Sequence, residues 1–158
     1  IIALEQRLGR RPAWVWAALC AMLAVYLAAY GWLTLLSRSA DERAQVNLTL
    51  FWSYREAFRW EGGPQIIRLG MAREILMNIL LYMPLGFLLP MVFDRLRFPG
   101  LASLGTAFLL SGATEALQYL THRGLCEADD LFNNLLGFLI GFGLLTAGRW
   151  LVKKLGRL

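Results

Sequence analysis

Few charged or amide side chains interrupt the apolar stretches of this chain, and Glu115 is the most informative of them. It lies in the otherwise uncharged run 99–121, about 10 Å from the end of that run at the helical rise per residue. A carboxylate in hydrocarbon needs a partner or a cavity, and a buried carboxylate can act as general acid or base. Gln118, Tyr119 and His122 follow three, four and seven residues later, on the same face of a helix. This face predicts a binding or catalytic site.

Two other apolar runs carry polar side chains near the end that lies on the same side as Glu115. Asp130 and Asn134 are four residues apart, and Gly137 and Gly141 continue the stripe that they begin. The two glycines predict close packing of a neighbouring helix. Asn78 and Tyr82 lie one turn apart on a further run. We therefore predict that three helices bring carboxylates and amides to a common depth.

These polar residues also have possible structural roles that do not involve a binding or catalytic site. Asn and Gln in membrane helices often only join helices, at around 0.6 kcal/mol each. Asp129 and Asp130 are also placed to cap a helix that begins there, because acids favour the positive end of the helix dipole. Arg123 is the nearest counter-charge to Glu115 in the sequence, although a solvated loop arginine is the ordinary alternative.

The composition indicates which elements position these residues. Of the 158 residues, 58% are apolar and 17% charged, against about 45–50% and about 25% in soluble domains. A soluble globule and, with two cysteines, a disulfide scaffold are thereby excluded. Since a span needs roughly 20 apolar residues, we predict an all-α, polytopic membrane bundle forming one domain over residues 1–158. Its four transmembrane helices are expected at 13–36, 75–93, 99–121 and 131–150.

Two further features concern the ends and loops of these spans. The first span is too long for the apolar core of a signal peptide, so we expect it to remain as an anchor. In the loop that follows, Leu50, Phe51, Tyr54 and Phe58 recur at helical spacing, which predicts a short helix in the outer membrane interface. A solvated linker is the alternative.

Basic residues predict the orientation. Four spans place both termini and the loop between the second and third spans on one side. Nine basic residues stand there in short segments: Arg7, Arg10, Arg11, Arg95, Arg97, Arg149, Lys153, Lys154 and Arg157. The positive-inside rule therefore places both termini in the cytoplasm. Nucleic-acid binding is disfavoured, because these charges flank lipid-embedded helices and form no continuous stripe.

Other chemistry finds little support. His122 is the single histidine, and Cys20 and Cys126 are expected at different depths, so we predict neither a metal nor a cofactor. Since no Ser-His or Cys-His pair is apparent, acyl transfer through a covalent intermediate is disfavoured.

Over about residues 45 to 145, the sequence resembles one known family, the VanZ-like membrane proteins. The resemblance rests on three groups of residues: Asn47-Leu48 with Phe51; Asn78 with Pro84-Leu85-Gly86-Phe87; and Glu115 with Gln118, Arg123, Asp130, Asn134, Gly137 and Gly141. The third group is the most specific. Thr49-Leu50 stands where a proline is common, and Glu127 replaces a frequent aspartate.

The resemblance implies a bacterial cell-membrane protein. The family takes its name from a protein associated with low-level resistance to teicoplanin, a glycopeptide whose target is the D-Ala-D-Ala terminus of the lipid-linked cell-wall precursor. The resemblance also adds Asn47 and Arg123 to the candidate ligand-binding residues.

Three hypotheses follow. In the first, an outward-facing polar site recognises an amphiphilic envelope molecule, such as a lipid-linked precursor or a lipoglycopeptide. The polar head contacts Asn78, Glu115, Gln118, Asp130 and Asn134, and arginines of the outer loop meet phosphate. The further candidate ligand-binding residues are Asn47, Tyr82 and Arg123. In the second, the protein is an intramembrane enzyme in which Glu115 acts as general acid or base on a lipid headgroup, assisted by Asp130. In the third, the polar residues only hold a scaffold together.

Overall fold

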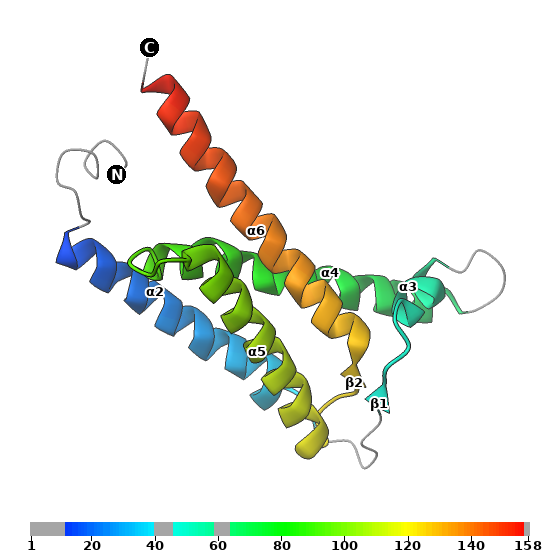
Figure 1. The fold of residues 1–158 in the computed structure, drawn as a ribbon. Helices are drawn as coiled ribbons and strands as arrows, with labels where there is room; N and C mark the ends of the chain where they lie inside the picture. Colours follow the sequence, from blue (N-terminus) through cyan, green and yellow to red (C-terminus); the bar gives the residue numbers. More distant parts are fainter. Residues whose placement is uncertain (1–11, 40–45, 59–63, 157–158) are drawn as a thin grey trace.

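In the part of the chain that the structure describes, four long helices and a short one are joined at one end by a pair of short strands (Figure 1). The computed structural model describes residues 12–39, 46–58 and 64–156. In chain order the elements are α2 (Ala13–Gly31), the π-helical turn η1 (Trp32–Leu36), β1 (Val46–Asn47), α3 (Trp52–Ala57), α4 (Gln65–Val92), α5 (Pro99–Leu120), β2 (Cys126–Glu127) and α6 (Ala128–Leu155).

Prolines mark three of the helix starts. Pro12 and Pro64 directly precede α2 and α4, and Pro99 is the first residue of α5. Proline suits these positions because its fixed φ is compatible with a helix and its missing N–H would have no partner in the first turn.

Three helical stretches are long and apolar enough to cross a membrane: Ala13–Leu36, Gln65–Val92 and Ala128–Leu155. They indicate a membrane protein, as the composition predicts. With 22 residues α5 is also long enough, but Glu115, Gln118 and several small polar residues make it less apolar, so the expected fourth span is not among these three. A short helix, α3, does lie in the loop where one was expected.

Two helices extend beyond their expected bounds. α4 begins at Gln65, ten residues before the predicted span, and α6 covers Ala128–Leu155 where 131–150 was expected. Glu74 ends the uncharged run that begins at Ile75, yet a charged residue does not end a helix, and α4 continues through it to Gln65.

The helix pair α4 and α6 is the most closely packed. A Cβ atom at Gly137 or Gly141 would overlap the main chain of Ile79 or Met83 on α4, and one at Gly86 would overlap the main chain of α6 at Phe138. Glycine is therefore required on both helices, because only its absent side chain lets the two backbones approach this closely. The sequence predicted close packing at Gly137 and Gly141.

Tyrosines join α2 to the other helices. The Tyr30 hydroxyl lies 2.9 Å from the Tyr82 hydroxyl of α4 and 2.7 Å from Thr114 Oγ1 of α5. The Tyr26 hydroxyl donates to the carbonyl oxygen of Leu81. α4 therefore runs against α2, α5 and α6, while the C-terminal half of α6 extends beyond the other helices (Figure 1).

The paired strands close one end of the bundle. β1 and β2 run parallel, with Val46 opposite Cys126 and Asn47 opposite Glu127. They place the start of α6 beside the end of α5, and the polar residues predicted from the sequence gather there.

Candidate functional site

A small cavity lies where α2 and η1, α5 and α6 meet the middle of α4. Six of the eight predicted site residues line it: Asn78, Tyr82, Glu115, Gln118, Asp130 and Asn134. Tyr30, Thr34, Arg38, Leu81 and Thr114 complete the lining. The space open to the centre of a water molecule is about 10 Å³, which is about enough for one water.

Glu115 is buried near the C-terminal end of α5. Its Oε2 accepts a hydrogen bond of 3.0 Å from the main-chain N–H of Glu127. Because Glu127 belongs to β2, the strand pairing holds this donor in place. The carboxylate therefore faces the cavity while β2 covers it from the end of the bundle.

Asp130 lies in the first turn of α6 and is also buried. Its Oδ1 accepts a hydrogen bond of 2.6 Å from Asn78 Nδ2 on α4. The positive end of the α6 dipole favours a carboxylate here. Two acids from different helices thus line a space the size of one water molecule.

The two cavity amides are each bonded through nitrogen. Gln118 Nε2 donates to the carbonyl oxygen of Thr34 at 3.0 Å, and Asn134 Nδ2 donates to Ser111 Oγ at 2.9 Å. Gln118 Oε1 and Asn134 Oδ1 are buried without a hydrogen-bond partner among the described residues. Buried oxygens of this kind normally accept a hydrogen bond, so this lining suits a small donor.

Arg38 is the cationic residue that lines the cavity with Glu115 and Asp130. The residue expected as counter-charge, Arg123, lies outside the lining and donates from Nη1 to the carbonyl oxygen of Leu35 at 2.9 Å. This bond joins the end of α5 to η1, which gives Arg123 a structural contact.

Asn47 also lies outside the cavity. It pairs with Glu127 across the strands, and its Oδ1 accepts a hydrogen bond of 3.0 Å from the Thr49 N–H. The main-chain N–H of Glu127 donates to Glu115. Asn47 on β1 is therefore linked to the cavity only indirectly, through its pairing with Glu127 on β2.

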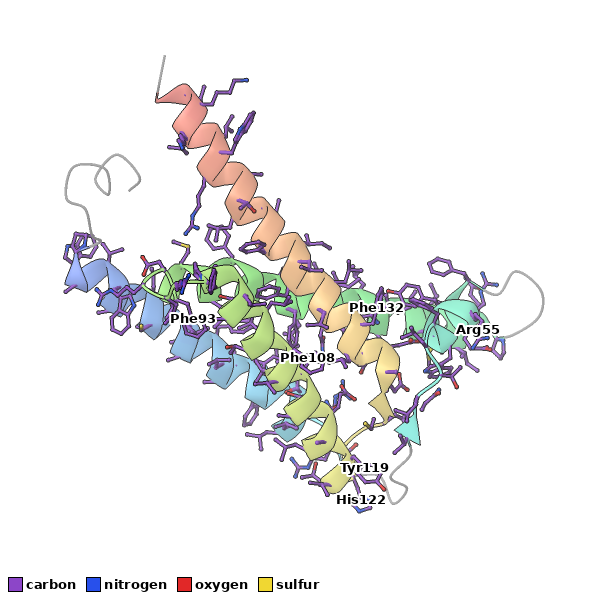
Figure 2. All side chains as sticks on the ribbon, in the orientation of Figure 1. Arg55, Phe93, Phe108, Tyr119, His122 and Phe132 are labelled. Carbon is purple, nitrogen blue, oxygen red and sulfur yellow. The ribbon has the colours of Figure 1, made fainter. Side chains whose placement is uncertain are left out.

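The predicted polar face of α5 ends at Gln118. Tyr119 and His122 were placed on the same face by their spacing, but both are exposed at the end of the helix (Figure 2). In the described segments, no group of three or more His, Cys, Asp and Glu side chains is arranged to hold a metal ion.

Beside the cavity lies a larger, open groove between η1 and the first half of α4. Its volume is about 480 Å³, which is in the range of small-molecule sites. Leu33, Met71, Met77 and Leu81 supply apolar surface, and Arg38, Arg73 and Glu74 supply charge. The groove and the cavity are adjacent, because they share four lining residues: Thr34, Arg38, Asn78 and Leu81.

Some residues of the cavity were not predicted from the sequence, although their spacing along the helices could have revealed them. Tyr30, Thr34 and Arg38 follow one another at four-residue intervals. Ser111 lies outside the lining but bonds to Asn134, and it stands four residues before Glu115. Both patterns place side chains on one helix face. Tyr30 and Arg38 lie close to the ends of the first apolar run, where aromatic and basic residues are ordinary membrane anchors.

Acidic residues also surround Glu127, which lies outside the apolar spans. Burial raises its pKa to about 7, and the charges of Glu74, Glu115 and Asp129 add to the effect. Burial likewise raises the pKa of the neighbouring Cys126 thiol. This end of the bundle is therefore rich in carboxylates that disfavour one another's ionisation.

Comparison with known proteins identifies the family of the chain. The VanZ/LLP1 family model matches residues 13–151. Protein VanZ of Enterococcus faecium is 27% identical over 123 residues, which cover 78% of this chain and 70% of that protein. No solved structure matches the chain. Since the matched residues include every long helix and both strands, the chain belongs to the VanZ/LLP1 family.

Proposed function

We propose that this protein binds an amphiphilic molecule of the bacterial cell envelope at the end of its helix bundle. The polar head of the ligand occupies the end of the groove at the cavity of Glu115 and Asp130, and its apolar chain lies along Leu33, Met71 and Met77. The observation that carries the proposal is the adjacency of the two spaces: an acidic cavity and a groove with apolar walls share four lining residues.

The placement in the membrane is part of the proposal. α5 crosses the membrane as a fourth span, the termini are cytoplasmic, and α3 lies in the outer interface. Exposed apolar side chains of and near α3, such as Phe51 and Phe58, support its contact with lipid. A ligand in the outer leaflet then reaches the groove from the side, between η1 and α4.

A lipid-linked cell-wall precursor or an acylated glycopeptide such as teicoplanin has the required amphiphilic character. Family membership supports a connection with teicoplanin resistance, because the family is named for protein VanZ. If the connection holds, a susceptible host that expresses this protein tolerates more teicoplanin.

Two matched glycine substitutions test the binding site. Gly70 lines the groove, and a Cβ added there meets no atom within 4 Å, so Gly70→Phe adds a large side chain at the groove without a clash at its Cβ. Gly105 on α5 is equally open and lies outside the groove, so Gly105→Phe is the control. We expect native mass spectrometry of gently solubilised protein to show a retained amphiphile with the parent and Gly105→Phe, and its loss with Gly70→Phe. Equal retention by all three would contradict the proposal.

A second candidate function is hydrolysis of a lipid headgroup. It is favoured by one observation, that two buried carboxylates line a space for one water. Glu115 would remove a proton from that water as general base. Glu115→Gln should then abolish product formation from vesicles of bacterial lipid extract while retention of the amphiphile persists, and a fully active Glu115→Gln protein would exclude this role.

A further inference from the structure

The cavity has a marked excess of hydrogen-bond acceptors. Gln118 and Asn134 are 2% and 4% exposed, and their side-chain oxygens accept no hydrogen bond from the described residues. Each amide nitrogen already donates to the protein. The carboxylates of Glu115 and Asp130 add further acceptors. A group that satisfies this lining must be rich in donors.

The size and charge of the cavity restrict that group. About 10 Å³ admits one centre the size of a water molecule. Of the cations in biological amphiphiles, a primary ammonium fits, since it is compact and carries three donors and no acceptor. A trimethylammonium is too large and has no N–H to donate. Two buried carboxylates favour a cation over a neutral hydroxyl.

The groove has the opposite charge preference. Two arginines, Arg38 and Arg73, line it together with one acid, Glu74, so its charged lining is net positive. A phosphate matches the planar, forked guanidinium groups. Arg38 lines both spaces, so its guanidinium is placed to meet an anion in the groove beside a cation in the cavity.

We propose that the ligand is a lipid with a primary ammonium next to a phosphate, of which phosphatidylethanolamine is the simplest. The ammonium enters the cavity of Glu115, Asp130, Gln118 and Asn134, and the phosphate lies against Arg73 and Arg38. The acyl chains follow the apolar wall of the groove. The inference rests on the proposed function, because it names the chemical class of the amphiphile.

The test compares lipids on the unaltered protein. An equimolar mixture of dioleoyl phosphatidylethanolamine, phosphatidylcholine, phosphatidylglycerol and phosphatidic acid is added to the delipidated protein, and bound lipids are identified by native mass spectrometry. We expect phosphatidylethanolamine to be retained about tenfold or more over phosphatidylcholine and phosphatidylglycerol, since buried charge-assisted hydrogen bonds are lost with each of those.

Two substitutions assign the two halves of the headgroup. Glu115→Gln keeps an acceptor for the Glu127 N–H and should abolish the preference for phosphatidylethanolamine. Arg73→Gln, at an exposed position, should weaken all four phospholipids and leave that preference unchanged. Glu56→Gln and Arg55→Gln on α3 are the matched controls, and both should behave as the parent.

The outcomes separate this inference from the proposed function. Equal retention of all four phospholipids by the parent would overturn the ammonium site and leave amphiphile binding intact. A rise in melting temperature with millimolar Mg²⁺ or Ca²⁺ that Glu115→Gln abolishes would also overturn it, in favour of a metal ion. Retention of no amphiphile of any kind would remove the proposed function as well.

Discussion

The Asp129 side chain joins the start of α3 to the start of α6. It is fully buried, and its carboxylate accepts hydrogen bonds from the main-chain N–H of Phe51, the N–H of Ser53 at 2.9 Å and the Ser53 hydroxyl at 2.6 Å. These donors belong to the start of α3, so Asp129 serves α3 and does not cap its own helix. Phe51 has a φ of 62°, a left-handed conformation that costs roughly 1–2 kcal/mol and that these bonds help to maintain.

Replacement of Asp129 should therefore release α3. Asp129→Ala leaves the buried N–H of Ser53 and the partly buried N–H of Phe51 without their acceptor, and we expect the free energy of unfolding to fall by about 3 kcal/mol. Ser53→Ala removes only the hydroxyl donor and should cost about 1 kcal/mol. Thermal melting in detergent measures both, and trypsin cleavage after Arg55 should accelerate in Asp129→Ala only. An Asp129→Ala protein as stable as Ser53→Ala would show that the carboxylate does not hold the loop.

Glu127 gives this end of the molecule a dependence on pH. Because burial and the charges of Glu74, Glu115 and Asp129 raise its pKa from 4.5 to about 7, the folded chain holds a proton in this interval that the unfolded chain releases. Its contribution to stability is therefore complete below about pH 4.5 and is lost as the pH rises through 7. We expect the melting temperature to decline from pH 5 to pH 8, and Glu127→Gln to reduce the decline. Glu56→Gln should keep the slope of the parent, and an unchanged slope in Glu127→Gln would contradict the assignment.

At the scale of the helices, the crossing of α4 and α6 holds the site together. Asn78 on α4 and Asp130 on α6 meet only if the two backbones approach closely, and the glycines permit this approach. Asp130, Asn134 and Gly137 lie on the same face of α6. The point at which Gly137 packs against α4 therefore also fixes where Asn134 meets the cavity.

A single methyl group should disturb this crossing. The Cβ of Gly141→Ala would overlap the main chain of Met83, whereas a Cβ at Gly143, two residues along the same helix, meets nothing within 4 Å. We expect Gly141→Ala to lower the free energy of unfolding by on the order of 1–3 kcal/mol, as overpacking does. Gly143→Ala should be neutral or slightly stabilising, because alanine favours a helix. Equal stability of the two proteins would mean that the helices can separate without cost.

Periodicity explains why much of the site was predictable from the sequence. Spacing along a helix fixes which side chains share a face, and this placed Asn134 with Asp130 and Gln118 with Glu115 on the cavity. Contacts that depend on the path of a loop follow no regular spacing in the sequence, so they cannot be predicted in this way. For this reason Arg123 was expected where Arg38 is found, and the docking of Asp129 on α3 was not foreseen.

At the scale of the whole molecule, the two ends of the bundle differ in chemistry. The acidic cavity and the strands lie at one end. At the other end Trp16 Nε1 donates to the carbonyl oxygen of Val92 at 3.2 Å, and the Arg95 guanidinium lies 5.4 Å from the Trp16 ring centroid. On the extended part of α6, Lys154 lies 5.1 Å from the Trp150 ring centroid. Tryptophan combined with basic residues is typical of a cytoplasmic membrane interface.

This asymmetry predicts which end a reagent outside the cell can reach. In a protein with Cys20→Ala and Cys126→Ser, single cysteines are introduced at Thr121, beside the cavity end, and at Lys153 on α6; both positions are exposed. We expect a membrane-impermeant maleimide to label Thr121→Cys in intact cells and Lys153→Cys only after permeabilisation, because basic residues are retained on the cytoplasmic side. The reverse pattern would place the cavity at the inner leaflet. A ligand would then have to come from the cytoplasmic half of the membrane, and an envelope molecule in the outer leaflet would be excluded.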